Sequence, residues 1–186
     1  MQRFDIELSS WILADGNYEF VSFEVGNRLK FALEFNLKQH AVCFEEPFLE
    51  ASEGRPSFYN SIAKVIFFNE SAWVLDFGSI SAYRQGPPMD LTFGQRVKAA
   101  LSLHVDPFHY YEELSKLEDI PPLIYEWELT GIHMNATPFS RKNDTEVSQR
   151  FIAIDKIDSL KDRELGCNGS YILHCTLADN KPTKTM

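Results

Sequence analysis

The sequence predicts an all-β fold: mainly an antiparallel sheet of about ten strands, with one short α-helix near residues 107–117. Three observations indicate this class. Apolar and polar residues alternate with a period of two over several segments, turn-forming residues separate those segments, and strands do not alternate with helices along the chain. Such a sheet buries its apolar face as a sandwich or as a strongly curved barrel, and the sequence leaves both open.

The first part of the chain carries clear alternation. Segments 4–8 and 30–38 each place large apolar residues on one face and polar residues on the other. Turn residues at 15–17 and 26–27 separate them from a predicted strand near 18–25, so the first 38 residues are predicted as a three-stranded meander. Segments 61–68 and 72–78 are mostly apolar and predict a hairpin buried on both faces or nearly so.

Alternation continues in the second part of the chain. Segment 95–105 is a half-buried strand, and segment 123–135 is a strand that places Tyr125 and Trp127 in the core and bulges near Gly131. Two more strands are expected near 150–157 and 170–177, after a polar loop at 137–148. We therefore predict one β-rich domain over 1–178 and a flexible carboxyl-terminal tail over 179–186.

The helix prediction rests on its two ends. Asp106 can cap the amino terminus, and Pro107 suits the first helical position. Pro121 and Pro122 end the segment. The spacing of three predicts that four residues of the helix face the core, namely Phe108, Tyr111, Leu114 and Leu117. This interpretation leaves Tyr110 on the surface as an aromatic contact residue.

The overall charge narrows the classes of partner. A net charge of −9 and a pI near 5.0 argue against nucleic acid and against anionic membranes, since both attract Lys and Arg. The cysteines lack metal-type spacing, and the first residues do not resemble a signal peptide, which favours a cytoplasmic protein. Nothing in the sequence predicts an oligomeric state.

No motif predicts an enzyme. GxGxxG, GxxxxGK[ST], GxSxG and HExxH are absent, so we expect no cofactor and favour a non-enzymatic role. The nearest approach to a metal cluster is His104, Asp106 and His109, whose side chains suit zinc or iron(II). Their spacing matches no strong signature, and we interpret Asp106 as the helix cap instead.

The main functional signal is the concentration of acidic residues between His104 and Glu128. This segment holds seven acids and one base, giving −6 of the total charge of −9. Aromatic residues lie among the acids, and an acidic face with an aromatic anchor suits a basic protein partner. The predicted partner-binding residues are Tyr110, Glu112, Glu113, Glu118, Asp119, Glu126 and Glu128.

These observations predict a protein-binding module that docks a basic protein through its acidic surface. In size and acidity the chain resembles immunity proteins, the small acidic inhibitors of basic nuclease toxins. That resemblance implies an inhibitor that blocks a toxin by covering its active site or substrate face. Two alternatives stay open: a β-barrel that binds a small ligand or acts as an enzyme, and a structural subunit of an assembly.

Overall fold

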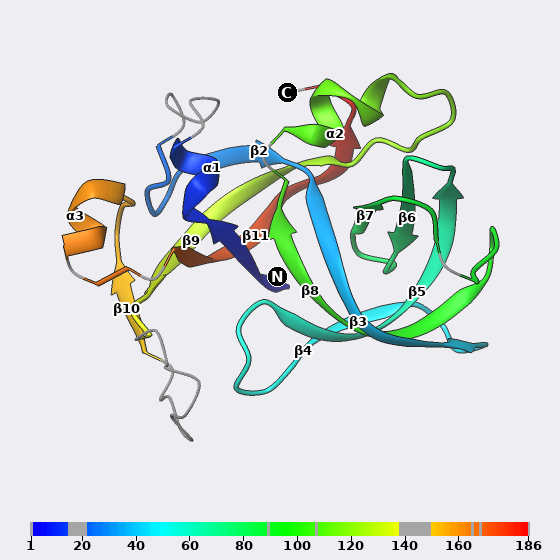
Figure 1. Ribbon diagram of the computed structural model, residues 1–186, viewed down its shortest axis with the longest axis horizontal. Coiled ribbons are helices and arrows are strands. Elements are labelled where there is room, and N and C mark those ends of the chain that lie inside the picture. Colours follow the sequence, from blue (N-terminus) through cyan, green and yellow to red (C-terminus); the bar gives the residue numbers. More distant parts are fainter. Residues whose placement is uncertain are drawn as a thin grey trace.

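The computed structural model describes residues 2–14, 22–88, 90–106, 108–137, 150–164, 166–167 and 169–185 (Figure 1). Its strands are β1 (Arg3–Ser9), β2 (Arg28–Phe31), β3 (Leu33–Cys43), β4 (Phe48–Ala51), β5 (Phe58–Phe68), β6 (Ala72–Asp76), β7 (Ser81–Gln85), β8 (Arg96–Val105), β9 (Ile124–Asn135), β10 (Phe151–Ile154) and β11 (Ser170–Thr183). The helical elements are α1 (Ser10–Ala14), α2 (His109–Glu112), the 3₁₀ turn η1 (Leu114–Lys116) and α3 (Ser159–Glu164). The all-β class is confirmed.

The strands form one curved sheet whose pairings close into two rings. In the first ring β9 pairs with β11, β11 with β1, β1 with β8, and β8 with β3. The chain enters β3 directly from β2, and β2 pairs with β9, which closes the ring. In the second ring β8 pairs with β5, β5 with β6, β6 with β7, and β7 with β3. Figure 1 shows the shared strands β3 and β8 between the two groups. The sheet is mixed, because β1–β8 and β3–β7 are parallel pairs.

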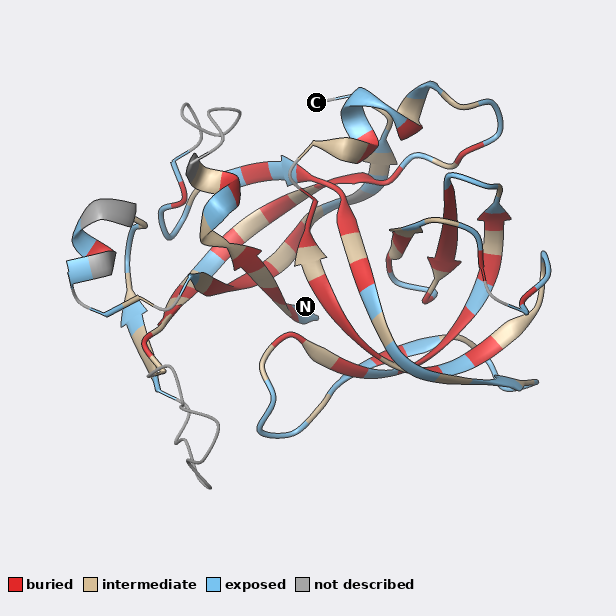
Figure 2. Ribbon diagram, in the orientation of Figure 1, coloured by how far each residue is buried: buried red, intermediate tan, exposed pale blue. Residues whose placement is uncertain are grey.

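The ring interiors are filled by the apolar residues that the alternation predicted. In β1, Phe4, Ile6 and Leu8 are fully buried, and the opposite residues of that strand lie outside (Figure 2). Tyr125 and Trp127 are also buried, as predicted. The Trp127 ring contacts Phe4 edge-on and stacks on Phe31, each at 5.5 Å between centroids. One apolar core thus contains residues from β1 through β11.

A second, smaller core lies on the outer side of β6 and β7, beneath α2 and η1. Ala72 and Val74 of β6 and Tyr83 of β7 pack there against Tyr110 and Leu114. Because β6 therefore contacts apolar side chains on both faces, its continuous apolar sequence is explained. The predicted hairpin of β5 and β6 is confirmed, but β5 is not buried on both faces, since Lys64 and Phe68 are exposed. This packing fixes the position of the acidic segment on the sheet.

Several local predictions are wrong. The first strands do not form a meander, since β1 pairs with β11 and β8 while β2 pairs with β9. The segment predicted as a tail is instead the end of β11, where Asp179 and Thr183 pair with β9. Helices α1 and α3 were not predicted. Pro107, most of the predicted loop 137–148 and part of the predicted strand 18–25 lie outside the described residues.

No helix among the described residues is both long enough and apolar enough to cross a membrane.

Candidate functional site

One carboxylate caps the start of helix α2 in the acidic segment. Asp106 is buried and accepts hydrogen bonds from the backbone N–H groups of Phe108, His109 and Tyr110, at 3.2, 3.0 and 2.9 Å. The predicted capping role of Asp106 is thereby confirmed. Burial raises the pKa of this carboxyl, against the opposing effect of the three N–H donors. The cap fixes the start of α2 and hence the side chains that the helix exposes.

Tyr110 is not a surface anchor, which corrects the prediction. Its side chain is fully buried, and its hydroxyl donates a hydrogen bond to the Pro121 carbonyl oxygen at 2.7 Å. Burial raises its pKa to about 12. Tyr110 and Leu114, four positions apart, both face the sheet. Leu114 is therefore buried as predicted, and Leu117 is partly buried against the same core. Tyr111 is 44% exposed and takes the surface position.

Four of the predicted acids form an exposed group around α2 and η1. Glu112, Glu113, Glu118 and Asp119 are all exposed, and among the described residues none of them forms an ion pair. Together with Tyr111 we call these residues the acidic platform. Its negative charge is not neutralised locally by ion pairing, although the exposed Lys116 lies within the same segment.

The other two predicted acids lie in a different electrostatic setting. Glu126 and Glu128 share the outer face of β9 and are half-buried. Their cross-strand neighbours in β2 are Lys30 and Arg28, and the Arg28 guanidinium lies 3.9 Å from the Glu126 carboxylate. These bases offset the two glutamates, so they contribute less to an outward negative field than the acidic platform does.

The metal-ligand candidates do not converge. The Asp106 carboxylate faces the start of α2, whereas the His104 ring bonds to Ser102. The His109 ring lies beside Tyr83, 6.2 Å between centroids. Within the described ranges no group of three His, Cys, Asp or Glu side chains could hold a metal ion. Cys175 is buried, and burial raises the pKa of its thiol, which disfavours a nucleophilic thiolate.

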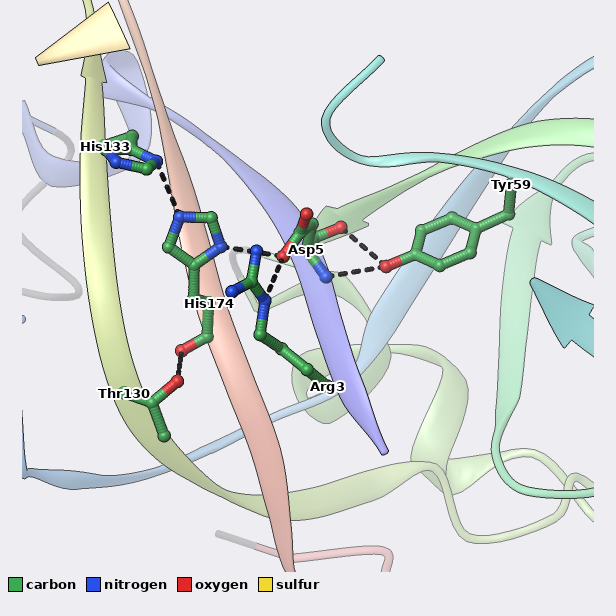
Figure 3. Close-up of polar contacts among 6 residues, drawn as sticks. All are labelled: Arg3, Asp5, Tyr59, Thr130, His133 and His174. Atoms are coloured by element: carbon green, nitrogen blue, oxygen red, sulfur yellow. Dashed lines mark hydrogen bonds and ion pairs between the residues drawn. The ribbon is translucent and has the colours of Figure 1, made fainter. Parts of the chain in front are cut away.

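A cluster that sequence reasoning missed lies on the outer face of β1, β9 and β11 (Figure 3). His174 Nδ1 lies 2.7 Å from Asp5 Oδ1, and His174 Nε2 lies 2.6 Å from His133 Nδ1. Arg3 bonds to the same Asp5 oxygen at 3.1 Å. The Tyr59 hydroxyl accepts the Asp5 backbone N–H and donates to the Asp5 backbone carbonyl. Asp5 is therefore fixed through both its side chain and its backbone.

Sheet register brings these residues together. Asp5 pairs with His174 across β1 and β11, and His174 pairs with Gly131 across β11 and β9. A register shift beside this pair leaves Thr130 as the extra residue of a bulge, as predicted near Gly131. A Cβ atom at position 131 would lie 3.1 Å from His174 Cδ2. Glycine there leaves room for the imidazole to lie close to β9.

The hydrogen bonds indicate which nitrogen atoms carry protons when both imidazoles are neutral. Burial acts to raise the pKa of Asp5, but the hydrogen bonds from His174 and Arg3 outweigh it and hold the pKa below its usual value. An ionised Asp5 can only accept, so neutral His174 carries its proton on Nδ1 and accepts at Nε2 from His133. His133 Nε2 is then a proton acceptor, and a proton gained there can be stabilised through His174 by Asp5.

A second array on the same face has the order of a hydrolytic triad but not its geometry. Ser102 Oγ lies 2.8 Å from His104 Nε2, and His104 Nδ1 lies 3.9 Å from the Glu7 carboxylate. The second distance is too long for a hydrogen bond. Ser102 is only 2% exposed, so a substrate could not reach its hydroxyl. We interpret this array as a structural contact between β1 and β8.

The imidazoles predict acid-sensitive stability. Burial lowers the pKa of His133 and of His104 below the ordinary value of 6.5. The unfolded chain therefore binds protons at a higher pH than the folded protein, and stability falls as the pH drops from about 7.5 to 5.5. The pKa of Asp5 is lowered in the folded protein, so protonation of Asp5 removes further stability as the pH falls below the ordinary pKa of this carboxyl, 3.8. The raised pKa values of Glu34 and Asp106 act in the opposite direction.

Urea unfolding across this pH range measures the effect. The variant His133→Asn, His104→Asn should flatten the slope of unfolding free energy against pH, since asparagine does not titrate. A variant that keeps the wild-type slope would show that other groups cause the pH dependence.

Comparison of the chain with protein-family models, with curated proteins and with solved structures found no match. The interpretation of both clusters therefore rests on their geometry.

Proposed function

We propose that the protein is a non-enzymatic, cytoplasmic binding module that docks a basic protein through the acidic platform. The observation that carries this proposal is the exposure of four carboxylates that form no ion pair among the described residues, beside an exposed Tyr111. Such a field steers a positively charged partner during encounter, and a partly exposed tyrosine supplies apolar contact area. The acids predicted on β9 play a minor part, because Arg28 and Lys30 face them.

Preorganisation supports the same function. The platform stands on a segment fixed by the Asp106 cap and by the buried side chains of Tyr110 and Leu114. A partner would therefore meet side chains on an ordered backbone and would not have to order the segment first. The partner that fits best is a toxin or nuclease with a Lys- or Arg-rich substrate face, which an immunity-type inhibitor would cover.

Affinity capture from the native cell tests this proposal with three baits. The wild-type protein should capture a protein with an isoelectric point above about 9. The reversed bait, Glu112→Lys, Glu113→Lys, Glu118→Lys and Asp119→Lys, should lose it. A control bait carries the same change of charge at exposed acids outside the platform: Glu45→Lys, Glu50→Lys, Glu53→Lys and Glu70→Lys. It should retain the partner, because local charge, not net charge, guides docking.

Two outcomes would contradict the proposal. One is equal capture by the reversed and wild-type baits, with circular dichroism showing that both are folded. The other is recovery of a multi-subunit assembly with all three baits, which would favour a structural subunit instead.

A further inference from the structure

A pocket of about 360 Å³ lies on the outer face of the sheet, separate from the acidic platform. Its walls come from β1, the β4–β5 connection and the strands β9, β10 and β11. Polar groups from Glu7, Arg55, Ser57 and Asn135 line it, with Ile172 and Phe58 among its apolar residues. Ile172 pairs with Glu7 on one side and with His133 on the other, so the pocket borders the histidine cluster. Its volume suits a small metabolite.

Ser57 has two unfavourable features in this pocket. It is 1% exposed, and its hydroxyl makes no hydrogen bond to any part of the chain that the structure describes. Its φ angle is 63°, in the left-handed region that serine rarely adopts. The backbone explains why the residue is held there, since the Ser57 carbonyl oxygen accepts the Leu103 N–H where β5 begins to pair with β8. The hydroxyl has almost no accessible surface, so Ser57 shapes the wall of the pocket and does not itself bond to a ligand.

The charged residues of the pocket indicate the class of ligand. Arg55 and Glu7 both line it, and they are not within ion-pair distance of each other. Among the described residues Arg55 forms no ion pair, and Glu7 has only the 3.9 Å approach of His104. A ligand with a single charge would satisfy one of the two residues. A ligand with both an ammonium and a carboxylate group would satisfy both.

We propose that this pocket binds a small zwitterion of the free amino acid class. Its carboxylate pairs with Arg55, and its ammonium group pairs with Glu7. Asn135 contributes little, because its amide already donates to Ser170 Oγ and accepts from the Thr137 N–H. This ligand site is independent of the docking function and can be present whether or not that function holds.

Calorimetric titration of the full chain with each of the common L-amino acids tests the proposal. At least one should bind with a Kd below about 1 mM. Two analogues of the best ligand, one lacking the ammonium group and one lacking the carboxylate, should each bind at least about tenfold more weakly. Failure of every amino acid to bind at about 10 mM, or equal binding by either analogue, would overturn the proposal.

Variants of the two charged residues test the site. Arg55→Gln and Glu7→Gln should each weaken binding at least about tenfold, whereas Arg28→Gln and Glu53→Gln, outside the pocket, should not. Ser57→Gly removes the unpaired hydroxyl and relieves the strained φ, so the affinity should not change while the melting temperature stays the same or rises. Wild-type affinity in the Arg55 or the Glu7 variant would overturn the proposal.

Discussion

Trp127→Ala is expected to lower the free energy of unfolding by about 3–5 kcal/mol, the largest single-residue effect that the structure indicates. The indole is fully buried between Phe4 and Phe31, and its N–H donates to the Phe31 carbonyl oxygen at 3.2 Å. Alanine would leave a cavity between β1, β2 and β9 and an unpaired carbonyl. A small domain has about 5–15 kcal/mol of stability in total, so the variant should be close to unfolding at 37 °C.

Urea unfolding followed by far-ultraviolet circular dichroism measures this loss without using tryptophan fluorescence. Trp127→Phe is the matched control, since it keeps a ring against Phe4 and Phe31 and should cost less than half as much. If the alanine variant loses less than about 1 kcal/mol, the contacts of Trp127 with Phe4 and Phe31 do not stabilise the fold as proposed.

Asp106→Ala should cost about 2–4 kcal/mol and should also weaken docking. It leaves the N–H groups of Phe108, His109 and Tyr110 without their acceptor at the start of α2. The helix has only four residues and cannot satisfy those groups internally. We expect amide hydrogen exchange to rise over 108–117 while β8 stays protected.

Asp106→Asn is the control for this prediction. It keeps one carbonyl oxygen, so its effect should be intermediate. Equal exchange rates over 108–117 in wild type and Asp106→Ala would contradict the role of the carboxylate in holding the acidic platform.

The sequence predicts most of the strands because each has one buried face. Tyr125 and Trp127 alternate with Glu126 and Glu128, and a period of two assigns the first pair to the core regardless of strand order. The end of β11 lacks this signal. Asp179 and Thr183 join the sheet through backbone pairing with β9, which does not require an apolar side chain.

The errors at the site have equally local causes. The spacing of three between apolar residues over 107–117 places Tyr110 on the surface. In the structure the buried residues Tyr110 and Leu114 are four positions apart, the spacing of neighbours on one face of an α-helix, and Tyr111 lies outward. The contact between Asp5 and His174 depends on the pairing of the first strand with the last, 169 residues away. The only sequence signal for it is that both residues fall on the polar face of an alternating strand.

Amide hydrogen exchange of the captured complex, compared with that of the free protein, locates the surface on which a basic protein docks. A partner bound to the acidic platform should slow exchange over 109–119 and leave exchange over 3–9 and 55–60 unchanged. Slower exchange confined to those latter segments, with 109–119 unchanged, would show that the partner does not dock on the acidic platform.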